Sequence, residues 1–290
     1  MGVIDSNGLL HKFEALLSSS ALAPATVANY LADLRAFLRW SEEARGATCS
    51  PLSLETEDIE EFCAYLENAQ GQAASTVNRR IQALRKFYGL AVAEGWTDDN
   101  PAEDVSLLRE SASERSRSLT PEDIARLLAA VQNSPSRRAA RDWAVIQLLL
   151  RAGLKLGELT ELRLSDVHLD AKQPYLSVRD KDGSPGRQVP LDAEVRQALS
   201  EYLDRRRAAA GVEHVCVNRD GKPLSTRSIQ RLLRRYGRAA GLEGLTTQAL
   251  RYVYASRVYS RSGDLKTVAR RLGHRHLATT IRYLRSNSEE

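Results

Sequence analysis

The end of the chain, "RRLGHRHLATTIRYLRSNSEE", holds His274 and, nine residues later, Tyr283, among several arginines. A tyrosine phenol can attack the phosphorus of a phosphodiester, after which negative charge builds on the phosphoryl oxygens and an alkoxide must leave. Catalysis of this step depends on positioning and on cationic donors aimed at those oxygens. Arginine suits the oxygens because its fork binds two of them, and lysine suits protonation of the leaving group. We therefore examined the sequence for cations that could surround Tyr283.

Three upstream segments supply such residues: "AGLKLGELTELRLSDV" with Lys155, "VRDKDGSPGRQVPL" with Lys181, and "TTQALRYVYASR" with Gln248 and Arg251. Together with "LGHRHLATTIRY", they resemble in order and spacing the motifs of the tyrosine recombinases, the phage-integrase and Xer family. The resemblance covers the whole chain, because a helical N-terminal core-binding domain is also usual in that family. It implies site-specific recombination of double-stranded DNA through a 3′-phosphotyrosyl intermediate, with no metal ion or other cofactor.

The resemblance also implies a role for each matching residue. Tyr283 would be the nucleophile, and Lys181, on a hairpin, would protonate the leaving 5′-oxygen. The scissile phosphate would be held by Lys155, Arg251, His274 and Gln248.

Two positions depart from the family's pattern. Lys155 stands where the family has its first arginine, and Gln248 stands where it has a histidine. Lysine keeps the charge but cannot make the bidentate contact, and the loss of one charge-assisted hydrogen bond costs about 1.5–3 kcal/mol. Glutamine can donate a hydrogen bond but cannot accept a proton from a phenol. The alternative function is therefore that of a non-catalytic or weakly catalytic DNA-binding relative, and Arg151, one helical turn before Lys155, is an alternative source of the missing arginine.

Each of these residues also has an ordinary structural interpretation. Tyr252, Tyr254 and Tyr259 compete with Tyr283 as nucleophile, but their helical spacing within one apolar run favours packing. Arg251 lies between apolar residues, where a charge needs a partner. That partner is either a phosphate or a buried Glu158. His274 alone would be typical of a helix cap.

Hydrophobic periodicity predicts a mainly α fold in two domains. Residues 1–102 read as a helical core DNA-binding domain, and the polar, serine-rich residues 103–118 read as a linker. Residues 119–290 read as the catalytic domain, mostly helical. Within this domain, "PYLSVRDKDGSPGRQVPL" contains two runs in which apolar and polar residues alternate, on either side of a turn. This pattern predicts a small β-hairpin.

Charge is divided unequally between these parts. Residues 1–118 contain 11 Lys and Arg against 18 Asp and Glu, a net charge of −7, whereas residues 119–290 have a net charge of +12. A basic second half indicates a polyanionic partner such as nucleic acid, although an arginine-rich proteome would produce the same bias. The cationic helix faces predicted to bind DNA carry Arg79, Arg80, Lys86, Arg227, Arg231 and Arg234. In "STRSIQRLLRRYGRAAG" the arginines recur on a different face from an apolar stripe of Ile229, Leu232, Leu233 and Tyr236.

The remaining features concern location and assembly. Three scattered cysteines and no apolar run of membrane-spanning length suit a cytoplasmic protein. Family resemblance implies a tetramer on two DNA sites. Because the stretch after Tyr283, "LRSNSEE", offers a single apolar anchor, Leu284, we expect a monomer in the absence of DNA.

Overall fold

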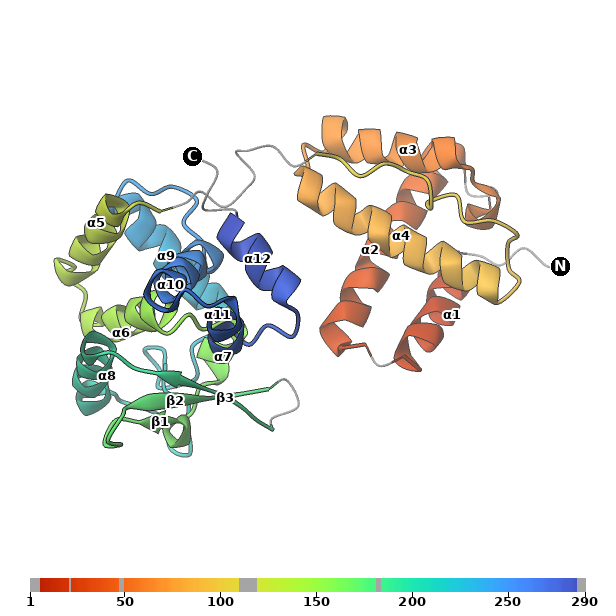
Figure 1. Cartoon of the computed structure of the whole chain (residues 1–290). Helices are drawn as coiled ribbons and strands as arrows, with labels where there is room; N and C mark the ends of the chain where they lie inside the picture. Colours follow the sequence, from red (N-terminus) through yellow and green to blue (C-terminus); the bar gives the residue numbers. More distant parts are fainter. Residues whose placement is uncertain (1–5, 21, 47–49, 110–118, 181–183, 286–290) are drawn as a thin grey trace. The chain divides into compact units, whose positions relative to one another are not determined.

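The computed structural model describes residues 6–20, 22–46, 50–109, 119–180 and 184–285. The chain divides into two compact units, Met1–Arg115 and Ser116–Glu290 (Figure 1). Within the described ranges, no helix combines the length and apolar character needed to cross a membrane.

The first unit is a bundle of helices around an aromatic core. Its helices are α1 (Ser6–Ser18), α2 (Pro24–Arg45), α3 (Thr56–Ala64) and α4 (Ala74–Ala93), with a 3₁₀ turn at Pro51–Ser53 and a π-helical turn at Tyr65–Ala69. Helices α1, α2 and α4 pack against one another, and the rings of Phe37, Phe62 and Tyr88 meet edge to face. Helical spacing along α4 predicts one apolar face of Val77, Ile81, Leu84, Tyr88 and Val92. The first four are buried, whereas Val92, near the end of the helix, is exposed.

The segment after α4 packs on the same unit. Ala102 and Val105 are buried, and their carbonyl oxygens accept hydrogen bonds from Arg85 at 2.9 and 2.7 Å. Asn78 exchanges two hydrogen bonds with the backbone of Leu108. Residues 103–109, although polar in composition, are therefore fixed to α4.

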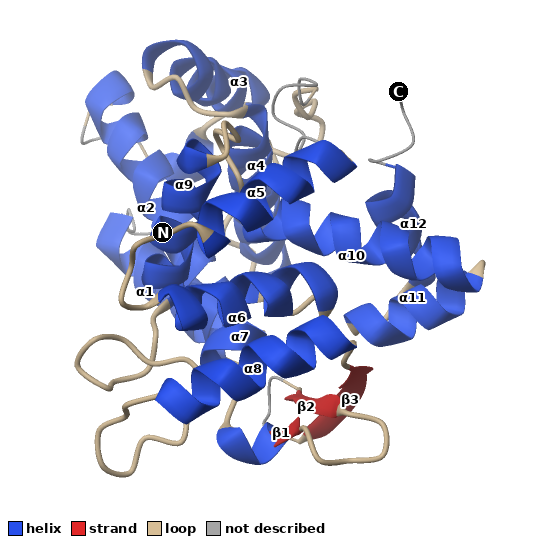
Figure 2. Ribbon diagram, turned by 90° about the vertical axis from the view of Figure 1, so that its left-hand side faces the viewer, coloured by secondary structure: helices blue, strands red, loops and turns tan. Residues whose placement is uncertain are grey.

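The second unit is mostly helical, with one small sheet at one side (Figure 2). Its elements in chain order are α5 (Pro121–Gln132), α6 (Ala139–Arg151), α7 (Leu156–Glu161), a 3₁₀ turn (Leu164–Asp166), β1 (Val167–His168), β2 (Tyr175–Arg179), β3 (Pro185–Pro190), α8 (Ala193–Arg205), α9 (Thr226–Ala239), α10 (Thr247–Ser262), α11 (Leu265–Leu272) and α12 (Leu277–Arg285). The strands are antiparallel in the order β1-β2-β3, so the predicted β2–β3 hairpin is confirmed, and β1 is an addition to it.

Helix α6 runs through the core of this unit and ends sharply before the site. Seven consecutive residues, Ala144–Leu150, are buried. Gly153 then adopts φ +59°, and a side chain there would meet the ring of Tyr254, because a Cβ atom would lie 2.2 Å from its Cδ1. The chain consequently turns at Gly153, and α7 begins after Lys155.

Candidate active site

Tyr283 lies on α12, against α10 and beside the end of α11. Gln248, in the first turn of α10, donates a hydrogen bond from Nε2 to the phenolic oxygen of Tyr283 at 2.5 Å. The ring of Tyr283 is flanked by those of Tyr252 and His274, with centroids 4.4 and 4.8 Å away. Helix α10 is set in place by Thr246, whose hydroxyl caps it by accepting from the Ala249 amide at 3.1 Å. Gln248 and His274, two predicted site residues that are separated in sequence, thus both contact Tyr283.

His274 follows the C-terminal turn of α11. Gly273 ends that helix at φ +65°, a left-handed conformation that glycine adopts readily. The imidazole Nδ1 of His274 and the hydroxyl of Thr280, which is fully buried on α12, form a hydrogen bond of 2.9 Å. Burial, followed by the charges of Arg251 and Lys155, lowers the pKa of His274 to about 4. His274 is therefore neutral at pH 7.

Arg251 is the cation at the centre of this region, and only 2% of it is exposed. Its two terminal nitrogens donate to the carbonyl oxygens of Gly153 and Leu272, whereas its Nη1 lies 3.9 Å from Glu158 Oε2. Its Nε has no hydrogen-bond partner among the described residues. Burial lowers the pKa of Arg251, and Glu158 opposes that shift. Two carbonyls therefore hold Arg251 by hydrogen bonds, and Glu158, the partner considered from the sequence, forms an ion pair with it.

Lys155 and Glu158 lie at the start of α7. The carboxylate of Glu158 accepts from the backbone amide of Lys155 at 2.7 Å, as a helix-capping group does. The ammonium of Lys155 is half-exposed and stands 3.6 Å from the same carboxylate. Burial lowers the pKa of Lys155, while the charge of Glu158 acts in the opposite direction.

Sequence reasoning missed Arg187, on β3. Its two terminal nitrogens each donate to one oxygen of Glu158 at 2.8 Å, and its Nε donates to the carbonyl of Arg271 at 2.7 Å. The signal was present, because Arg187 is two residues from the buried Val189 in a strand and so shares its inward face.

Not every predicted site residue joins this cluster. Lys181 lies outside the described residues. Arg151 is not the missing arginine in this structure, since it pairs with Asp192 and Glu194, both at 3.1 Å. Of the competing tyrosines, Tyr254 is buried in the core and Tyr259 is exposed.

The cationic residues predicted to contact DNA occupy two helices. On α4, Arg79 and Arg80 both pair with the buried Asp33, and Lys86 is exposed. On α9, Arg227, Arg231 and Arg234 are exposed, opposite a buried face of Ile229, Leu232, Leu233 and Tyr236. The predicted division of α9 into an apolar and a cationic face is therefore confirmed.

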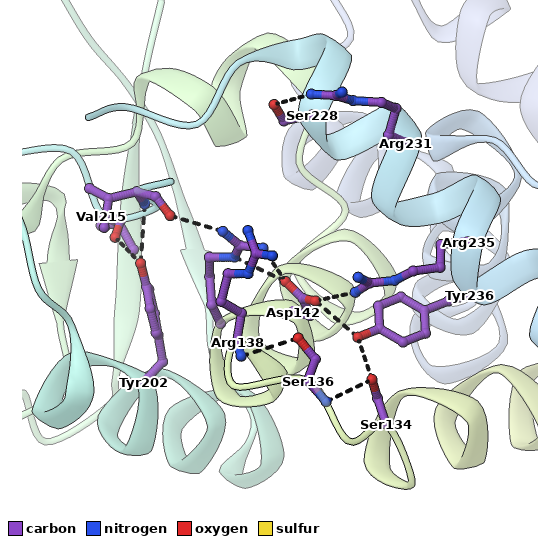
Figure 3. A network of polar contacts seen from close by, with 12 residues as sticks. Ser134, Ser136, Arg138, Asp142, Tyr202, Val215, Ser228, Arg231, Arg235 and Tyr236 are labelled. Atoms are coloured by element: carbon purple, nitrogen blue, oxygen red, sulfur yellow. Dashed lines mark hydrogen bonds and ion pairs between the residues drawn. The ribbon is translucent and has the colours of Figure 1, made fainter. Parts of the chain in front are cut away.

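A cavity of about 590 Å³ borders α9 and the start of α6. It is lined by five arginines, Arg138, Arg141, Arg219, Arg231 and Arg235. Two of these arginines bind the fully buried carboxylate of Asp142, which accepts a hydrogen bond from Arg141. The same carboxylate accepts from Arg235 and, at 2.9 Å, from the hydroxyl of Tyr236 (Figure 3). Asp142 thus fixes two of the arginines.

Comparison with known proteins places the chain in a family. Residues 117–290 match the phage integrase family, and residues 10–95 match the phage integrase N-terminal SAM-like domain. Because the first match spans more than half of the chain, the protein belongs to the phage integrase family, the tyrosine recombinases. Site-specific DNA recombination is the function that this membership supports.

Similar proteins include tyrosine recombinases XerC from two bacteria. That of Pseudomonas aeruginosa PAO1 is 33% identical over 272 residues, covering 93% of this chain and 87% of the relative. That of Alcanivorax borkumensis is 32% identical over 274 residues, covering 92% and 85%.

Two solved structures share the fold. The Tn1549 transposon integrase in complex with a circular intermediate DNA has a TM-score of 0.76 at 20% identity, covering 97% of this chain and 94% of that one. A lambda integrase dimer bound to a COC′ core site has a TM-score of 0.74 at 20% identity, covering 98% and 78%.

Proposed function

We propose that this recombinase cleaves and rejoins DNA with Tyr283 as its nucleophile. The observation that carries the proposal is the placement of the phenol: Gln248 donates to its oxygen, and His274 lies against its ring. In the proposed step the phenolic oxygen loses its proton to a solvent water and bonds to phosphorus. The bond from phosphorus to the 5′-oxygen breaks, leaving a 3′-phosphotyrosyl link.

The scissile phosphate would be bound by Lys155, Arg251, His274 and Gln248. Arg251 is held by two backbone carbonyls, so little reorganisation is needed when the phosphate arrives. Its unpartnered Nε is a buried donor, a costly state that an anionic ligand would relieve. Because Nδ1 of His274 is bonded to Thr280, Nε2 is the nitrogen left for a phosphoryl oxygen.

Lys181 is proposed as the general acid that protonates the 5′-oxygen. The support is the resemblance of its segment and the hairpin of β2 and β3, whose connection carries it. An ammonium at this point would supply the proton that the leaving alkoxide requires.

Duplex DNA is the proposed partner. The exposed arginines of α9, Arg227, Arg231 and Arg234, are available to phosphates or base edges, and the arginine-lined cavity continues that basic surface. In the first unit Arg79, Arg80 and Lys86 are proposed to contact the backbone. We assign residues 1–102 to DNA binding and 119–290 to catalysis, with 103–118 between them.

Assembly is proposed to follow DNA binding, from a free monomer to a tetramer on two sites. Leu284, the apolar residue after the nucleophile, packs inside its own unit against the cluster around Tyr254 and Val258. Because Leu284 is partly buried there, it has less apolar surface left for a second subunit. Light scattering without DNA tests this proposal, and a stable dimer or tetramer at micromolar concentration would contradict it.

The decisive experiment traps the covalent intermediate. The protein is incubated with a nicked suicide duplex, from which the cleaved end diffuses away, and the adduct is resolved on a denaturing gel. We expect an adduct with the natural protein and none with Tyr283→Phe. Tyr259→Phe, an exposed tyrosine on α10, is the matched control and should form the adduct normally. Tight, specific binding with no adduct in any variant would instead indicate a DNA-binding relative without catalysis.

A further inference from the structure

We propose that Arg187 is a positioning residue of the active site, which holds Glu158 so that Lys155 and Arg251 stay available to the scissile phosphate. The inference rests on the proposed function, because it concerns the same phosphate site. It adds Arg187 to the residues to which the resemblance assigns a role.

The contacts of Arg187 leave its guanidinium little freedom. It makes a bidentate pair with Glu158, both bonds 2.8 Å, and its third donor reaches the carbonyl of Arg271 at 2.7 Å. Only 12% of its side chain is exposed. In this way β3 is tied both to the start of α7 and to the end of α11, the two segments that present Lys155 and His274.

The bidentate pair with Arg187 keeps Glu158 ionised and fixes its distance from Lys155 and Arg251. Burial by itself would raise the pKa of Glu158, but the hydrogen bonds and charge of Arg187 outweigh it, and the pKa is lowered. With both oxygens occupied, Glu158 stays 3.6 Å from Lys155 Nζ and 3.9 Å from Arg251 Nη1. These are ion-pair distances without a hydrogen bond, so both cations retain donors for another anion.

The charge count of the cluster shows the consequence. Lys155, Arg187 and Arg251 contribute three positive charges, Glu158 contributes one negative charge, and His274 is neutral at pH 7, which leaves a surplus of +2. A phosphodiester attacked by a phenolate passes through a state with two negative charges. The surplus matches that state, and without Arg187 it would fall to +1 with Glu158 free to neutralise Lys155.

The glycine of the "LGH" motif fits the same arrangement. A Cβ atom at Gly273 would lie 2.8 Å from Nη1 of Arg187. The guanidinium of Arg187 therefore lies where a side chain at position 273 would be, so glycine at this position leaves room for Arg187 beside His274.

The test compares three variants by single-turnover adduct formation at saturating suicide DNA. Arg187→Gln lowers the surplus to +1 and should slow the rate constant about tenfold, the effect of one charged hydrogen bond, while DNA affinity changes less than about threefold. Adding Glu158→Gln to Arg187→Gln returns the surplus to +2 and should restore the rate to within about threefold of the natural protein. If Arg187 and Glu158 served only to hold the fold together, the double variant, which lacks both partners, would form the adduct no faster than Arg187→Gln.

Arg126→Gln is the matched control. Arg126 also joins a carboxylate, Asp123, to the carbonyl at the end of a helix, Ala240, but it does so on α5, and it contacts none of the site residues. Its adduct rate should match that of the natural protein. If it slows as much as Arg187→Gln, general loss of an inter-element tie explains both, and the proposal fails.

A second readout needs no DNA cleavage. The chain has seven lysines, so the ammonium of Lys155 can be assigned by comparison with Lys155→Arg and titrated by NMR. The charged groups facing it are Glu158, Arg187, Arg251 and, when protonated, His274. In Arg187→Gln a cation is lost and Glu158 is released, so the pKa of Lys155 should rise; an unchanged titration would overturn the proposal. If the natural protein forms no adduct, the proposed function fails. The titration of Lys155 then still tests whether Arg187 controls the charge around that residue.

Discussion

The phenolic oxygen of Tyr283 is approached by a donor, the Nε2 of Gln248, at 2.5 Å. A donor at this point stabilises the phenolate but cannot take the phenolic proton. Gln248 therefore favours the phenolate form of Tyr283, the proposed nucleophile, without being able to act as its base.

Replacement of Gln248 should separate these two effects. Gln248→Ala removes the hydrogen bond, and we expect adduct formation to slow about tenfold, as for the loss of one bond to a developing charge. Gln248→His supplies a group with an ordinary pKa of about 6.5 that can accept the proton. Its rate should exceed that of the natural protein above pH 7 and decline as the pH falls through the pKa of the new imidazole. Single-turnover rates from pH 5.5 to 8.5 test both variants, and a flat profile for Gln248→His would exclude a role in proton transfer.

Lys155→Arg tests the first departure from the family pattern. Arg187 already occupies both oxygens of Glu158, so the donors of a new arginine at 155 would remain for the phosphate. We expect the cleavage rate to rise about tenfold, the value of one added charge-assisted bond. A lower rate would show that the site is packed around lysine.

The depressed pKa of His274 predicts a dependence of stability on pH. A histidine whose folded pKa is about 4 binds a proton less readily in the folded state than in the unfolded state, where its pKa is about 6.5. Its contribution to stability is therefore lost as the pH falls from about 6.5 towards 4.

His274→Gln should lessen that loss. Urea unfolding at pH 7 and pH 5 should show a smaller decrease in unfolding free energy for the variant, by about 1 kcal/mol after discounting for a half-buried side chain. His276→Gln, an exposed neighbour, is the control and should behave like the natural protein. Equal decreases in all three proteins would show that His274 titrates normally.

The cationic face of α9 predicts a salt dependence. If Arg231 and Arg234 each neutralise one phosphate, their joint replacement by alanine should reduce the slope of log affinity against log salt by about 1.8. Arg196→Ala, at an exposed arginine of α8, should leave the slope unchanged. Binding isotherms between about 50 and 200 mM salt measure this, and an unaltered slope for the double variant would place the DNA on another surface.

Sequence was sufficient for features that depend on local patterns. Periodicity predicted the apolar face of α9, and alternation around the turn predicted the β2–β3 hairpin, because each pattern fixes which side chains share a face. The resemblance of the motifs also selected Gln248, Arg251, His274 and Tyr283, which the fold brings together.

What sequence did not give were contacts between distant segments. Arg187 meets Glu158 across 29 positions and Arg271 across 84, and no local pattern specifies either partner. Arg151 lies on the expected helix, but it pairs with Asp192, the N-cap of α8, and with Glu194 in the first turn of α8. The need for glycine at 153 could not be predicted locally, because the ring of Tyr254, which leaves no room for a side chain there, is about a hundred residues away in sequence.

The carboxylate of Asp142 has a consequence for motion. It has no exposed surface, and it links α6 to the second half of α9 through Arg235 and Tyr236. Amide hydrogens near those two residues should therefore exchange slowly with solvent, while the first turn of α9, beyond the reach of this anchor, should exchange faster. If α9 binds DNA as proposed, its first turn could adjust to the groove while its second half stays rigid. That rigidity would come from a buried carboxylate that does not itself contact the nucleic acid.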